Sequence, residues 1–163
     1  MIHKPRLLFR IVIPGRPATK KNSGIITTIN GRRYILPSKP YALYLRHCKP
    51  FMLAAKNRAG GEARYPLTVP VSVTANYYLP RFANWPDLVG LMQATGDILE
   101  SCGVISNDRL IADWQDTRIA GVDREYPRTE IKIYEAQISE TMACGYCGRS
   151  RKEKPTENAS EKI

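Results

Sequence analysis

The sequence predicts an α/β (α+β) fold, in which two main helices pack on a small mixed β-sheet. Several short segments alternate apolar and polar residues, as half-buried strands do, and two longer segments have the period of a helix. The expected strands and helices interleave along the chain, which favours one layered domain. The chain has 163 residues, 43% of them apolar, enough for a proper core.

The first expected strand covers residues 6–13, where large apolar side chains alternate with polar or mixed positions. A loop rich in Pro, Gly and Lys follows. The segment IITTINGRRYIL then places Asn30 and Gly31 between two β-prone arms. Asn-Gly accepts the positive φ angles of a type I′ turn, so this segment predicts a hairpin.

Residues 39–58 are rich in Ala and Leu and predict a helix that Pro50 would kink or split. Residues 69–79 alternate clearly and predict a strand. Residues 86–102 predict the clearest helix, and Gly103 stands where a left-handed C-cap belongs. At 100° per residue, its apolar arc consists of Leu88, Leu91, Met92, Thr95, Ile98, Leu99 and Cys102.

A turn is expected at Asn107 and Asp108, followed by strands over residues 110–119 and 128–136. We therefore expect a folded domain over residues 1–136. Residues 137–163 are polar and poor in aromatic side chains, so they predict a flexible tail.

The charge of the chain favours a polyanionic partner. The formal net charge is +10 and the pI is about 9.6, a balance that suits phosphate backbones without determining a fold. No apolar run is long enough to span a bilayer, so no membrane partner is expected. The four scattered cysteines fit a reducing cytoplasm better than a disulfide scaffold.

Two carboxylates stand out in this basic chain. Asp87 lies at the start of the helix over residues 86–102, and Asp108 lies just past the turn after it. If the chain doubles back, both could hold one Mg²⁺ ion, with Asp113 or Asn107 as possible further ligands. Asp87 could instead only interact with the helix dipole, and Asp108 could be an ordinary turn aspartate.

The segment PDLVGLMQATGDILESCGVISNDRLIAD resembles the signature of RusA-family Holliday junction resolvases. The similarity covers roughly residues 8–135, in the same order of elements. It implies a RusA-like nuclease domain that forms a homodimer and resolves four-way DNA junctions by paired nicks. Mg²⁺ would be the cofactor, with Mn²⁺ as a substitute. The resemblance also implies a cytoplasmic protein of bacterial or phage origin.

Matched residue by residue, Asp87 takes the place of the first catalytic and metal-binding aspartate of the family, and Asp108 that of the second member of an Asp-Asp pair. Asp97 matches an aspartate within the helix. The chain departs from the signature at four positions, Val89, Gly90, Gln93 and Asn107, and two of these replace expected acids. The alternative is therefore a catalytically weakened or inactive relative that binds branched DNA without cleaving it.

Basic residues in the first loop and hairpin could form a phosphate track beside Asp87. The expected DNA-binding residues are Lys20, Lys21, Asn22, Arg32, Arg33, Arg81 and Arg118. Phe82 and Trp85 are expected to anchor a loop or pack in the core, and a wedge at an opened junction is the alternative.

The tail carries one C-x-x-C pair, Cys144 and Cys147. A structural zinc site needs four ligands, and no second pair follows, so zinc is not expected unless two protomers share one ion. A third reading of the chain, a basic interaction protein organised by zinc in its tail, would require that sharing.

Overall fold

The computed structural model describes residues 5–20, 25–36, 38–59, 63–83 and 85–138. In chain order its elements are β1 (Leu7–Pro14), β2 (Ile25–Ile29), β3 (Arg32–Leu36), α1 (Lys39–Arg58), β4 (Val71–Leu79), α2 (Leu88–Ser101), the 3-10 turn η1 (Asp108–Leu110), β5 (Ile111–Asp113), β6 (Arg118–Val122) and β7 (Arg128–Glu135). The predicted mixed α+β architecture with two helices is confirmed.

The main sheet has five strands in the order β1-β7-β4-β5, and β6 also pairs with β4. The β1–β7 and β4–β7 pairs are antiparallel, whereas β5 and β6 run parallel to β4, one beyond the other along the same edge. Strand β1 forms the opposite edge. The sheet is therefore mixed, with β4 and β7 at its centre.

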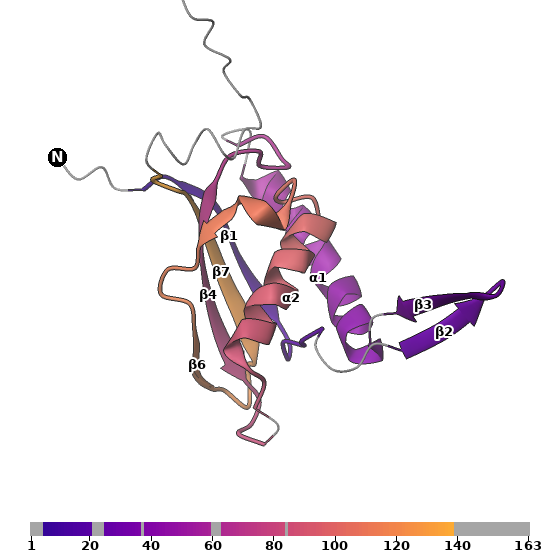
Figure 1. The fold of residues 1–163 in the computed structure, drawn as a ribbon. Helices are drawn as coiled ribbons and strands as arrows, with labels where there is room; N and C mark the ends of the chain where they lie inside the picture. The colour runs from indigo at the N-terminus through magenta and orange to yellow at the C-terminus, as the bar shows by residue number, and fades with distance from the viewer. Residues whose placement is uncertain (1–4, 21–24, 37, 60–62, 84, 139–163) are drawn as a thin grey trace, which may run out of the picture.

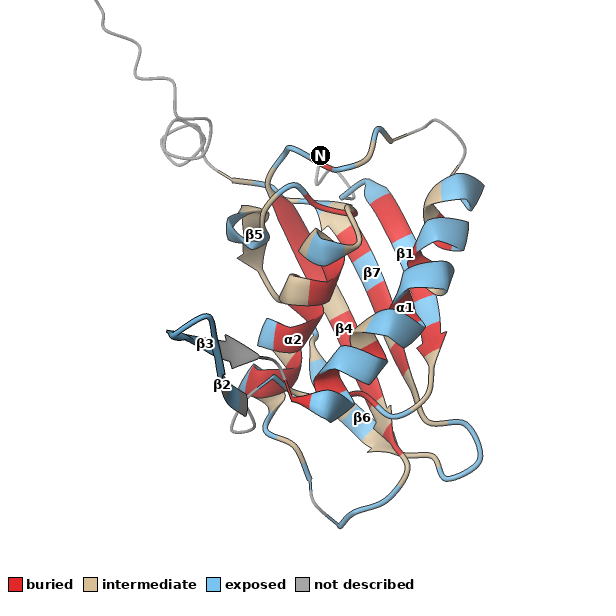
Figure 2. Ribbon diagram, turned by 90° about the vertical axis from the view of Figure 1, so that its right-hand side faces the viewer, coloured by how far each residue is buried: buried red, intermediate tan, exposed pale blue. Residues whose placement is uncertain are grey.

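Both helices cover the same face of the sheet (Figure 1). Buried residues line that face of the strands, while the outer surface of α1 is exposed (Figure 2). Two buried hydroxyl pairs join the layers: Tyr44 Oη lies 3.0 Å from Thr129 Oγ1, and Tyr77 Oη lies 2.8 Å from Thr95 Oγ1. Because strand side chains alternate between faces, the polar set on β4 and β7 faces away from the helices.

The helix predictions hold in detail. Leu91, Ile98 and Leu99 in the predicted apolar arc of α2 are buried, and Gly103 has a φ of +63° just after the helix. Helix α1 is continuous from Lys39 to Arg58, so the predicted split at Pro50 is wrong, although proline removes one backbone hydrogen bond from the helix.

The predicted hairpin is also present, with Asn30 at φ 51° and Gly31 at φ 76° in its turn. It stands apart from the sheet and the helices (Figure 1). Ile26, Ile29 and Tyr34 are exposed, and the hydrophobic core contains no hairpin residue from 26 to 34.

One predicted strand is wrong. Residues 110–119 do not form a single strand but two short ones, β5 and β6, separated by a turn. Asp116 has a φ of 50°, and Thr117 Oγ1 accepts a hydrogen bond of 3.0 Å from Ala75 N. A side-chain hydroxyl thus replaces the backbone pairing that a continuous strand would have made with β4.

No described helix combines the length and the apolar character needed to cross a membrane. Cys144 and Cys147, and with them the predicted tail from residue 139 onward, lie outside the described residues.

Candidate functional site

Asp87 is the N-cap of α2. Its Oδ1 accepts a hydrogen bond of 2.6 Å from Gly90 N, and its backbone has the extended conformation of a cap residue. This is the interaction by which an aspartate satisfies one of the free N–H groups at a helix start. The local reason for the position of Asp87 is therefore helix capping, and its side chain remains exposed.

Asp108 lies beside the other half of α2. A Cβ built on Gly96 would lie 3.8 Å from Asp108 Cβ and 3.5 Å from Ile111 Cδ1. The backbone N–H of Asp108 donates to Glu100 Oε2 over 3.2 Å, so Glu100 is the acidic neighbour of Asp108. Turn η1 thus packs against the C-terminal half of the helix.

Asp87 and Asp108 lie at different points along α2. The Asp87 carboxylate lies at the N-terminal end, next to Gly90. Asp108 lies beside Gly96, six residues further along, a rise of roughly 9 Å at 1.5 Å per residue. The two aspartates are therefore offset along the helix, and we derive no chemical step through a metal.

The other two possible ligands are engaged elsewhere. Asp113 Oδ1 accepts a hydrogen bond from Ser72 Oγ, at the beginning of β4 and away from the loop that leads to Asp87. Asn107 Oδ1 accepts from Arg109 N and Arg109 Nε over 3.1 and 3.0 Å, and so caps η1. Among the described residues, no group of three or more His, Cys, Asp or Glu side chains could hold a metal ion.

Two departures from the RusA signature lie at the helix start. A Cβ on residue 90 would come within 2.9 Å of Asp87 Oδ1, so glycine leaves room for the capping carboxylate. Val89 is 58% exposed, and nothing in the structure explains an apolar side chain there.

Three groups with raised pKa values belong to the core. Burial raises the pKa of the Cys48 thiol to about 12 and raises the pKa of the Tyr44 and Tyr77 hydroxyls. Both tyrosines are hydrogen-bonded between the layers. None of these three groups is exposed, so they support packing rather than acid–base chemistry.

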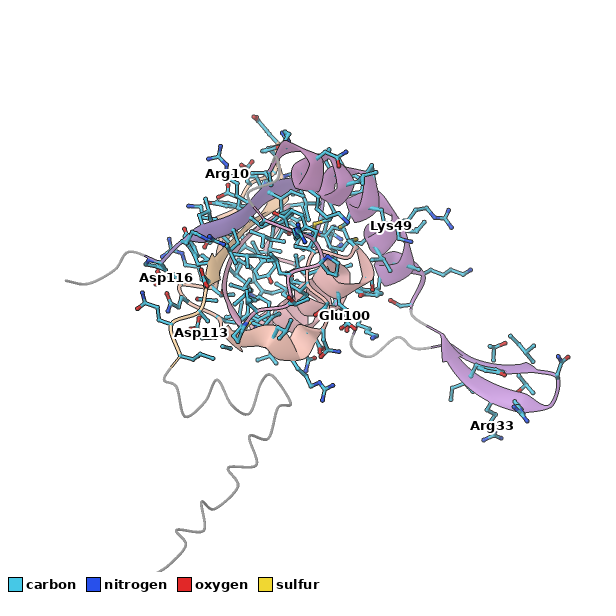
Figure 3. The ribbon with its side chains drawn as sticks, turned by 90° about the horizontal axis from the view of Figure 1, so that it is seen from above. Arg10, Arg33, Lys49, Glu100, Asp113 and Asp116 are labelled. Atoms are coloured by element: carbon cyan, nitrogen blue, oxygen red, sulfur yellow. The ribbon has the colours of Figure 1, made fainter. Side chains whose placement is uncertain are left out.

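The predicted phosphate track is divided in the structure. Lys20 Nζ lies 3.1 Å from Asp97 Oδ2 and forms an ion pair with it, so this lysine is used within the protein. Arg32, Arg33, Arg81 and Arg118 are exposed. Lys21 and Asn22 lie outside the described residues. Arg33 on the hairpin lies on the other side of the protein from Arg10 on β1 (Figure 3).

A row of cations crosses the uncovered face of the sheet. Arg10 on β1 is in direct register with Lys132 on β7, which faces Thr74 on β4. Arg118 on β6 pairs with Asn76 on β4, and it lines a hollow together with Lys132 and Asp116. We call Arg10, Lys132 and Arg118 the basic row. None of the three forms an ion pair within the described part of the chain.

The register of the basic row is electrostatically unfavourable by itself. Like charges directly opposite in an antiparallel pair destabilise it. The nearby Glu130 does not offset them, because its Oε1 lies 2.6 Å from Arg128 Nε. Arg10 and Lys132 were absent from the predicted DNA contacts, although both occupy outward positions of strands that the sequence predicts. Only the register of the sheet reveals that they are opposite one another.

Charge is unevenly distributed along the chain: Glu62 is the only acidic residue before Asp87.

The loop after β4 carries two exposed aromatic side chains. Phe82 and Trp85 are 72% and 45% exposed rather than packed in the core. Their rings stack at 5.7 Å with an interplanar angle of 8°. Core packing, one of the two expected roles, is therefore wrong for both side chains.

Comparison with models of protein families and with characterised proteins finds no match to this chain.

Proposed function

We propose that this protein binds branched DNA through the phosphate backbone and does not cleave it. The observation that carries the proposal is the basic row, in which Arg10 and Lys132 stand opposite each other and no cation has an ion-pair partner in the described part of the chain. A polyanion on the open sheet face would relieve this repulsion, and the net charge of +10 agrees with such a partner.

Branched DNA is favoured over a straight duplex by the arrangement of the cations. Arg10 of the basic row and Arg33 of the hairpin lie on different sides of the protein (Figure 3). A straight duplex contacts only one side of a small protein, whereas the diverging arms of a four-way junction can contact two sides. The resemblance of the segment from Pro86 to Asp113 to RusA-family resolvases points to the same class of DNA, as does the homodimer that it implies.

The separation of Asp87 from Asp108 is why we propose binding without cleavage. The family chemistry would require carboxylates that converge on the scissile phosphate. Here one carboxylate caps α2 and the other lies beside Gly96. Val89 and Asn107 remove two further acids from the signature.

Lys132→Ala tests the proposal with two measurements. Removing one of two opposed cations should raise the free energy of unfolding by about 0.2–1 kcal/mol. The same change should weaken binding of a four-way junction and reduce the slope of log K against log salt by about 0.9. Lys39→Ala is the control, because it removes the same single positive charge from the exposed first turn of α1. Equal effects of Lys132→Ala and Lys39→Ala on junction binding would contradict the proposal.

A further inference from the structure

We propose that the β2–β3 hairpin is an arm that enters the major groove of duplex DNA. The inference rests on the proposed function, and it identifies which element reads the duplex arms and how. It begins from an energetic problem: an isolated two-stranded hairpin is at best marginally stable in water. Ile26, Ile29 and Tyr34 are exposed, and no hairpin residue from 26 to 34 belongs to the core.

The dimensions of the hairpin suit a groove. Each strand has five residues, so the ribbon is roughly 17 Å long at about 3.4 Å per residue. The major groove is about 8.5 Å deep and 12 Å wide, and it admits a two-stranded β-ribbon. The tight turn at Asn30 and Gly31 keeps the end narrow. The hairpin extends from the body of the protein without obstruction (Figure 1).

The charges of the hairpin favour DNA over a protein as its binding partner. Residues 25–36 contain no acid and carry Arg32 and Arg33 next to the turn. Because neighbouring strand residues point to opposite faces, each face of the ribbon presents one arginine. A groove has a wall of phosphates on both sides of an inserted ribbon. Both arginines would therefore find anions, and either could reach a guanine edge.

A second copy of this chain would fit less well. A two-fold contact between hairpins would bring the same arginines together without a carboxylate on either side. Burying an unpaired charge is costly, so such an interface would need acids that the hairpin lacks. Apolar side chains next to the arginines can instead contact thymine methyl groups in the groove: Ile29 is the cross-strand partner of Arg32, and Tyr34 follows Arg33.

The test compares two double variants of the full chain that lose the same charge. R32A/R33A changes the ribbon, whereas R46A/K49A changes exposed positions on α1 that have no assigned role. Both are measured for affinity to a duplex of about 20 base pairs and for protection of guanine N7 from dimethyl sulfate. Guanine N7 lies in the major groove. Unchanged thermal unfolding would show that each variant is folded.

The proposal predicts that R32A/R33A weakens duplex binding about tenfold or more and abolishes N7 protection. R46A/K49A should change affinity less than threefold and keep the protection. Equal protection in both variants, or protection of adenine N3 in the minor groove alone, would overturn it. The proposal would also be overturned if R32A/R33A changed the sedimentation coefficient of the DNA-free protein. Such a change would mean that a second copy of the chain covers the hairpin. Failure of the unsubstituted protein to bind any DNA would instead reject the proposed function itself.

Discussion

Substitution of Asp87 can show whether its carboxylate acts as a helix cap or as a metal ligand. Asp87→Ala removes the acceptor of the 2.6 Å hydrogen bond from Gly90 N. Loss of an N-cap of this kind costs about 1 kcal/mol. For a chain of this size that corresponds to a decrease in Tm of about 3 °C. Asp87→Asn keeps an equally good capping acceptor, so it should leave Tm within about 1 °C of the unsubstituted protein.

Gly90→Ala gives an independent measure of the same contact. Alanine in a helix is favoured over glycine by about 1 kcal/mol. The new Cβ would come within 2.9 Å of Asp87 Oδ1, so the carboxylate must move and the cap weakens. The two effects should nearly cancel, leaving stability almost unchanged.

Thermal and urea unfolding, with and without Mg²⁺, is the assay for these variants. The capping account predicts that Mg²⁺ does not change the difference in Tm between the unsubstituted protein and either variant. If Mg²⁺ stabilised the unsubstituted protein but neither variant, Asp87 would be a metal ligand and the reasoning would fail. Equal destabilisation by both substitutions would also refute the capping role.

Three further predictions concern the rest of the fold. Gly96→Ala should raise the free energy of unfolding by about 0.5–1 kcal/mol, because its Cβ meets only ordinary contacts of 3.5 and 3.8 Å; urea unfolding that shows a loss would indicate strain against η1. Cys48, with a pKa raised by burial to about 12, should resist alkylation at pH 8 in the folded protein and react only on unfolding, which mass spectrometry of labelled peptides would reveal. The Tyr126 backbone N–H and Arg128 hold the pKa of Asp123 below its ordinary value, so its stabilisation is present above about pH 4 and lost as the pH falls through the lower, folded-state pKa. Asp123→Asn should therefore be less stable than the unsubstituted protein at pH 7, and the difference should shrink in acid.

The elements that sequence predicts well are those whose pattern is local. The first strand, the Asn-Gly hairpin, both helices and the last strand follow from periodicity and turn chemistry, and their bounds agree within about two residues of those observed. The break between β5 and β6 depends on Thr117 bonding to Ala75 on another strand. That contact is tertiary, so periodicity within residues 110–119 does not reveal it.

The candidate site shows the same limit. The sequence places Asp87 at a helix start, which is correct, and its capping alternative matches the observed hydrogen bond. The convergence with Asp108 required the chain to double back after Gly103. The chain does so, but η1 places Asp108 beside Gly96 and not beside Gly90, where the Asp87 carboxylate lies. The opposed Arg10 and Lys132 depend on strand register, which composition does not determine.

A single reaction tests the central claim most directly. The protein is bound to a labelled four-way junction, Mg²⁺ or Mn²⁺ is added over a range of concentrations, and native and denaturing gels are run from the same samples. We predict a salt-sensitive complex on the native gel and intact strands on the denaturing gel at every metal concentration. Paired nicks that Asp87→Asn abolishes would contradict the account, because they would require Asp87 to act on the scissile phosphate.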